Sequence, residues 1–102
     1  MRTLSLALTT SLLVLDLSGS ASATGMYNCD SGDRSTWKTM DQLKTKMVLE
    51  GWQVRRIKED GNCYEAYGTS PDGKRVEAYF HPVTLELHLM ARRGQLLFRK
   101  GG

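Results

Sequence analysis

The segment Ser70-Pro71-Asp72-Gly73-Lys74 constrains the fold of this chain most strongly, because it predicts both a β-hairpin and its register. Proline sets φ at the first turn position and glycine accepts a positive φ, a pattern typical of a three-residue loop that closes a type I turn with a bulge. Ser70 then faces Lys74. Each residue of the strand before the turn is thereby paired with one residue of the strand after it.

This register assigns the side chains of the hairpin to two faces, because successive side chains of a strand point to opposite sides. We expect one set to pack under a helix: Tyr64, Ala66, Val76, Ala78 and Phe80. A second set shares the reverse face: Glu65, Tyr67, Arg75, Glu77 and Tyr79. The phrase Glu-Ala-Tyr, which occurs at 65–67 and again at 77–79, is therefore divided between the core and the reverse face.

A helix is predicted to begin after Thr39, since Thr39-Met40-Asp41-Gln42 matches a capping box. Gly51 provides the stop signal. The apolar stripe of this helix follows helical spacing and consists of Met40, Leu43 and Met47, with Val48 beside them. We interpret the methionines as core side chains rather than as ligands of copper or haem.

An earlier hairpin is predicted at Asp60-Gly61, a strong turn signal with both central residues at positive φ. This position would place Ile57 opposite Tyr64. Val54 and Ile57 are three residues apart, so in a regular strand their side chains would point to opposite faces of the sheet. Both can reach the same face only if a β-bulge inserts an extra residue near Arg55 or Arg56.

The segment after Pro82 is expected to continue the sheet, because apolar residues alternate with polar ones from Val83 to Leu89. A helix over residues 83–92 is the alternative. Arg92-Arg93-Gly94 is a candidate turn, and residues 96–98 form either a last short strand or a packed tail. The predicted fold class is α+β, with one helix packed on an antiparallel β-meander of three to four strands in two layers.

The N-terminal residues 1–23 resemble a signal peptide. Arg2 precedes an apolar run from Leu4 to Leu17, and Ala21-Ser22-Ala23 is a typical cleavage site. The run is too short to span a bilayer. We expect cleavage after Ala23, a periplasmic or secreted location and no stable membrane insertion.

Cys29 and Cys63 are the two cysteines of the chain and are predicted to form a disulfide, because an exported protein meets an oxidising compartment. Closing the loop between them would stabilise the fold by about 3–4 kcal/mol. Residues 24–38 lack periodicity and are interpreted as an irregular segment tied down by this disulfide. Residues 39–102 are expected to form the domain proper.

The formal net charge of +3 is mildly basic and decides little about partners. Export argues against nucleic acid. Cations gather in three short stretches, at residues 55–58, 92–93 and 99–100. Such stretches usually decorate a solvated face, and a site for an anion or an anionic lipid is the alternative.

Residues 37–86 carry an ordered set of motifs, in which Trp37 and then EGWQVRRIKEDGNCYEAYGTSPDGKRVEAYFHPVT stand in sequence. This order resembles the PepSY domain, in particular its small exported members. The matching positions are Trp52, Val54, Ile57, Tyr64, Glu65, Asp72, Gly73, Arg75, Glu77, Pro82 and Thr84. The chain departs from the pattern at His81, where aspartate is common, and at Leu85, where a glycine usually forms a tight turn.

The resemblance implies a non-enzymatic binding or inhibitory module, because PepSY domains occur in peptidase propeptides and in bacterial envelope proteins. No catalytic residues or cofactor are predicted. The expected partner is an envelope protein, either a peptidase or a membrane redox protein. The candidate partner-binding face is the reverse face, with Glu65, Tyr67, Arg75, Glu77 and Tyr79.

The alternative function is that of an accessory to a membrane cytochrome, haem or copper redox system. Its support in the sequence is His81, His88 and Met90, together with the other methionines. If residues 85–90 form a strand, His88 and Met90 share a face and could offer an imidazole and a thioether to copper.

Overall fold

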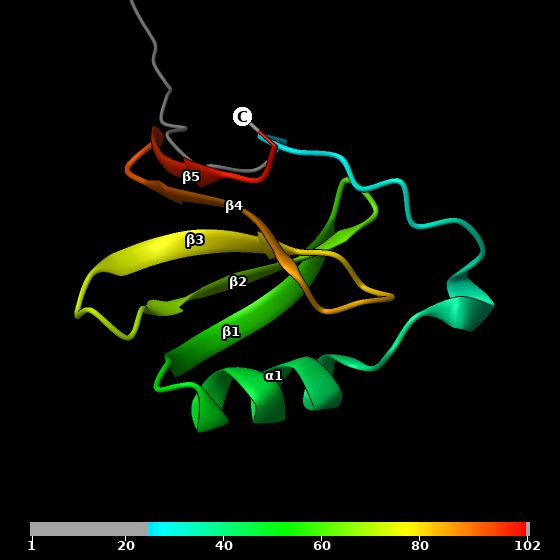
Figure 1. Cartoon of the computed structure of the whole chain (residues 1–102), viewed down its shortest axis with the longest axis horizontal. Coiled ribbons are helices and arrows are strands. Elements are labelled where there is room, and N and C mark those ends of the chain that lie inside the picture. Colours follow the sequence, from blue (N-terminus) through cyan, green and yellow to red (C-terminus); the bar gives the residue numbers. More distant parts are fainter. Residues whose placement is uncertain (1–24, 102) are drawn as a thin grey trace, which may run out of the picture.

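The computed structural model describes residues 25–101, so the predicted signal peptide lies outside the described residues. The elements are a 3₁₀ turn η1 (Arg34–Thr36), helix α1 (Met40–Leu49) and strands β1 (Gln53–Asp60), β2 (Cys63–Thr69), β3 (Arg75–Phe80), β4 (Leu87–Arg92) and β5 (Gln95–Arg99). The strands form one antiparallel sheet in chain order (Figure 1). The predicted α+β class is confirmed, but the sheet has five strands rather than three to four.

The β2–β3 hairpin has the predicted register throughout, with Tyr64 opposite Phe80 and Tyr67 opposite Glu77. Its turn is closed by two backbone hydrogen bonds of 2.8 Å, because the Ser70 N–H donates to the Lys74 carbonyl and the Gly73 N–H donates to the Ser70 carbonyl. Gly73 has a φ of +90°, which glycine adopts without steric cost.

The β1–β2 hairpin turns one residue later than predicted. Its central residues are Gly61 and Asn62, each with a φ of 60°, so Ile57 faces Ala66 rather than Tyr64. Glycine and asparagine tolerate positive φ best. The N-terminal segment also packs against this turn: a Cβ added at Gly61 would overlap the carbonyl oxygen of Tyr27. The predicted bulge is confirmed, since the register shifts between Val54 and Arg56.

Helix α1 begins with the predicted capping box. The Gln42 N–H donates to the Thr39 hydroxyl over 3.0 Å, and the Thr39 N–H donates to the Gln42 side chain over 2.8 Å. Leu43 and Met47 are fully buried, as expected for residues four apart on one face. Val48 is 51% exposed, and its assignment to the core was wrong because it lies about 100° around the helix from Met47.

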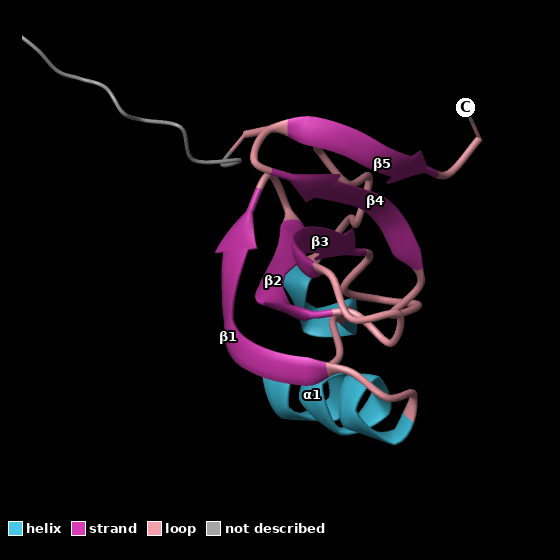
Figure 2. Cartoon of the chain, turned by 90° about the vertical axis from the view of Figure 1, so that its left-hand side faces the viewer, coloured by secondary structure: helices cyan, strands magenta, loops and turns pink. Residues whose placement is uncertain are grey.

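Helix α1 covers one face of the sheet at the β1 end, and β5 lies far from it (Figure 2). The core between these layers includes every hairpin residue that was predicted to pack under the helix. Its buried members are Leu43, Met47, Trp52, Tyr64, Ala66, Val76, Ala78, Phe80 and Leu85.

The chain after β3 turns before it enters β4. Leu85 has a φ of 63°, and its N–H donates to the His81 carbonyl over 2.7 Å. The tight turn therefore persists without the usual glycine, and the Leu85 side chain is buried in the core. Residues 83–86 were wrongly expected in a strand, and the alternative helix over 83–92 is replaced by β4. The turn before Gln95 and the last strand are confirmed.

Candidate functional site

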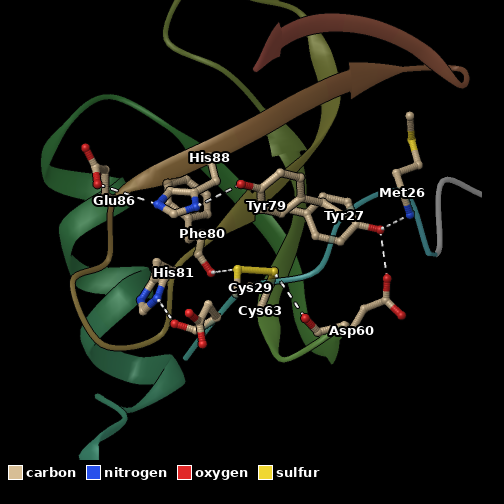
Figure 3. The surroundings of a disulfide bond; sticks show 12 residues. Met26, Tyr27, Cys29, Asp60, Cys63, Tyr79, Phe80, His81, Glu86 and His88 are labelled. Atoms are coloured by element: carbon tan, nitrogen blue, oxygen red, sulfur yellow. Dashed lines mark hydrogen bonds and ion pairs between the residues drawn. A yellow bond between two sulfur atoms is a disulfide. The ribbon is translucent and has the colours of Figure 1, made fainter. Parts of the chain in front are cut away.

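The reverse face of the sheet is divided into a covered half and an open half. The covered half carries a second small core, named here the disulfide cluster: Cys29, Cys63, Tyr79, Leu89 and Ala91, with Met26 and Tyr27 packed against them. The predicted bond between Cys29 and Cys63 is present (Figure 3). Because the Cys29 N–H also donates to the Gly61 carbonyl over 2.8 Å, the N-terminal segment is tied across this half of the sheet.

Tyr79 belongs to the disulfide cluster and is 0% exposed. Its hydroxyl donates to Asp60 Oδ2 over 2.8 Å and accepts from the Met26 N–H over 3.3 Å (Figure 3). Burial, and then the bond to Asp60, raise the pKa of Tyr79. The hydroxyl therefore anchors the N-terminal segment. The expectation that Tyr79 belongs to an accessible binding face was wrong, because the N-terminal segment packs over it.

Glu65 is also 0% exposed, so its assignment to an accessible binding face was wrong as well. Neither of its carboxylate oxygens accepts a hydrogen bond of ordinary geometry from a described residue, although the Tyr67 hydroxyl lies near enough to favour the ionised form. The nearest cation is the Lys58 ammonium, with 3.8 Å between Nζ and Oε1. Burial raises the pKa of Glu65, and this effect exceeds the opposing effects of the Tyr67 hydroxyl and then of Lys58.

Tyr67, Arg75 and Glu77 are the predicted binding residues that remain on the open half. Tyr67 and Glu77 are partly exposed, and Arg75 is exposed. Cations lie over the Tyr67 ring, with the Arg56 guanidinium carbon 4.9 Å and the Lys58 Nζ 5.7 Å from its centroid. Such contacts stabilise by about 0.5–1 kcal/mol at exposed sites and hold the ring in place.

A hollow of about 250 Å³ lies beside Tyr67 on this open half. We name it the arginine hollow, because it is lined by Arg55, Arg75, Arg92 and Arg93, together with Tyr67 and Glu77. The sequence shows the stretches 55–58 and 92–93 as separate cation clusters. The sheet order brings them to one place, and only the pairing of β1 with β2, β2 with β3 and β3 with β4 could have indicated this.

His81 and His88 lie close together, with 5.3 Å between ring centroids (Figure 3). His81 Nε2 donates to the Asp30 carbonyl over 3.0 Å, and the Val83 N–H donates to His81 Nδ1 over 3.2 Å. Both nitrogens of His81 are therefore engaged by the backbone. Burial, followed by the neighbouring His81, lowers the pKa of His88.

His88 and Met90 do not share a face, contrary to the expectation behind a copper site. The His88 ring packs edge-on against Tyr27 of the disulfide cluster, whereas Met90 packs against the helix-side core. A β-bulge at residue 88 causes the difference, since Tyr79 pairs with Leu89 while Phe80 pairs with Leu87. Across residues 25–101, no three His, Cys, Asp or Glu side chains are grouped so that they could hold a metal ion.

No helix within the described part of the chain is long and apolar enough to cross a membrane. In comparisons with known proteins, a family model described as the peptidase propeptide and YPEB domain, PepSY_2, matches residues 6–89. The match includes α1 to β3 and the first half of β4, and it ends before β5. Comparisons with curated proteins and with solved structures gave no match.

Proposed function

The chain belongs to the PepSY family of peptidase propeptide and YPEB domains, and from this premise we propose that it is an exported, non-enzymatic module that binds a protein partner in the bacterial envelope. Domains of this family are propeptide-like or inhibitor-like modules. A peptidase is accordingly the partner that we propose, with the module regulating or inhibiting it.

The open half of the reverse face is the observation that supports this proposal most directly. Tyr67 stands there on a central strand, with the guanidinium of Arg56 over its ring. Tyrosine and arginine are enriched where proteins contact one another, because each offers apolar area together with hydrogen-bonding groups. A rigid aromatic side chain on a sheet loses little conformational entropy when a partner covers it.

The disulfide supports the proposed location. Cys29 and Cys63 are bonded, and disulfides persist in oxidising compartments such as the periplasm. Together with the signal-like residues 1–23, this favours a periplasmic or secreted protein.

The test is capture of partners from an envelope extract by the immobilised protein and by its Tyr67→Ser variant. Leu49→Ser is the matched control, because Leu49 is 82% exposed and lies on α1, on the opposite side of the sheet. We expect Tyr67→Ser to lose a partner that Leu49→Ser retains. The same two variants are then added to purified envelope peptidases. Identical partner lists for all forms, with no effect on any peptidase, would overturn the proposal.

A further inference from the structure

The formal net charge of the arginine hollow equals that of the whole chain. The whole chain has a formal net charge of +3 at pH 7. The hollow is lined by four arginines and one glutamate, which also gives a net charge of +3. The remaining formal charges of the chain therefore sum to zero, so the hollow is a local concentration of positive charge.

The four arginines of the hollow are not neutralised from within the described chain. Among residues 25–101, none of them has a carboxylate within the 4.0 Å that defines an ion pair. Arg34, by contrast, forms a paired contact with Glu59, with both nitrogen-to-oxygen distances at 2.7 Å. Guanidinium groups that have no carboxylate partner repel one another and attract oxyanions, which they bind in a planar, often bidentate geometry.

The hollow is built mostly on the sheet, which fixes the backbone positions of its lining residues before any ligand arrives. Arg55 comes from β1, Arg75 from β3 and Arg92 from the end of β4. Its volume of about 250 Å³ suits one or two side chains. It is smaller than the sites of about 300–1,000 Å³ that enclose drug-sized ligands and cofactors.

We propose that the arginine hollow binds carboxylate groups of an acidic segment of the protein partner. The inference rests on the proposed function, because a polypeptide presents its anions as Asp and Glu side chains and as its C-terminal carboxylate. Glu77 lines the same hollow and opposes any such ligand by like-charge repulsion. Two substitutions should therefore change the affinity for an acidic ligand in opposite directions. Removing an arginine weakens binding, and removing the Glu77 charge strengthens it.

The experiment titrates the purified protein, with its disulfide intact, with a fluorescent glutamate-rich hexapeptide. The same peptide with glutamine at each glutamate is the uncharged probe. Inorganic phosphate and vesicles that contain anionic phosphatidylglycerol are the other two probes. The variants are the double substitution Arg75→Gln with Arg92→Gln, the single substitution Glu77→Gln, and Lys44→Gln, which removes one exposed cation from α1.

We expect saturable binding of the acidic peptide that weakens as salt is raised, and much weaker binding of the uncharged peptide. The double arginine variant should bind at least about tenfold more weakly, and Glu77→Gln about threefold more tightly. Lys44→Gln should stay within about twofold of the parent. Thermal melts check that every variant is folded. Binding only of phosphate or only of vesicles would overturn the proposal, as would equal losses in the double arginine and Lys44 variants.

The proposed function and this inference can fail separately. If the parent protein captures an envelope partner and the double arginine variant captures it equally well, the hollow is not its binding site and the function stands. If the acidic peptide binds with the expected pattern while no partner or peptidase responds, the hollow is an anion site and the proposed function fails.

Discussion

Replacing Glu65 by glutamine should stabilise the protein at neutral pH, although the residue lies at the centre of the sheet. The carboxylate is 0% exposed, and neither oxygen accepts a hydrogen bond of ordinary geometry from a described residue; the nearby Tyr67 hydroxyl offsets only part of the cost of burial. Glutamine has nearly the same shape and carries no charge. The substitution therefore removes the cost of burying an ionised group while it keeps the volume of the side chain.

The magnitude follows from two opposing effects. Transfer of a carboxylate into the protein interior costs several kcal/mol. The Lys58 ammonium, 3.8 Å from the carboxylate, stabilises the ionised form by about 4 kcal/mol at an effective dielectric constant near 20. The actual stabilisation is smaller because the Lys58 side chain is 33% exposed and hydrated. The raised pKa of Glu65 indicates that burial prevails. The glutamine amide also lacks partners there, so only the part of the burial cost that depends on charge is relieved, and we expect Glu65→Gln to gain about 1–2 kcal/mol at pH 7.

The increase in the free energy of unfolding caused by Glu65→Gln should become larger as the pH rises. The folded-state pKa of Glu65 lies above its ordinary value of 4.5, so the native state holds a proton that the unfolded state has already lost. The stability that this proton contributes is fully present below the unfolded pKa, and it is lost as the pH rises through the folded pKa. The difference between Glu65→Gln and the parent should therefore be small near pH 4 and should grow towards pH 7.

Urea unfolding followed by tryptophan fluorescence measures this difference between pH 4 and pH 8. Glu77→Gln is the matched control, since it makes the same chemical change on the same face at a side chain that is only partly buried. Glu77→Gln should raise the free energy of unfolding by less than Glu65→Gln does. A Glu65→Gln protein that is less stable than the parent at pH 7, or a difference that does not change with pH, would refute the reasoning.

Three further sets of substitutions test the disulfide, the turn at Leu85 and the contact between Gly61 and Tyr27. Replacing Cys29 and Cys63, 34 positions apart, by serine should lower the free energy of unfolding by about 3–4 kcal/mol in urea, and a loss below about 1 kcal/mol would argue against the disulfide. Leu85→Gly should relieve about 1–2 kcal/mol of positive-φ strain but lose about 2–5 kcal/mol of buried side chain. A net loss in thermal melts is therefore expected, and equal or greater stability would contradict it. Gly61→Ala should displace Tyr27 and destabilise by about 1–3 kcal/mol, measurable in urea and as faster reduction of the disulfide; an unchanged reduction rate would show that the contact is unimportant.

The parts of the fold that sequence could predict are those set by neighbouring residues. The Ser70 to Lys74 turn fixes its own register, because a three-residue loop leaves one way to pair the strands that flank it. The Thr39 capping box is equally local, since its two hydrogen bonds join residues three apart. Both predictions needed no knowledge of the rest of the chain.

The parts that could not be predicted depend on contacts between distant segments. Asp60-Gly61 and Gly61-Asn62 are both acceptable turns by local chemistry, and the N-terminal segment packed against Gly61 accompanies the second. Leu85 could occupy a glycine position because the core encloses its side chain, which offsets the strain of its φ. The arginine hollow, in the same way, unites cations that the sequence places far apart.

The disulfide determines how much of the predicted site remains accessible. Strand parity placed Glu65, Tyr67 and Tyr79 on the reverse face, but parity does not say what covers that face. By tying the N-terminal segment to Cys63, the bond lets the main chain at Met26 reach the Tyr79 hydroxyl. Half of the face thereby becomes core, and the proposed binding surface is confined to the half around Tyr67. A partner that binds there, as we propose, would meet these cations, so we expect the charge of the ligand, rather than its apolar area, to decide recognition.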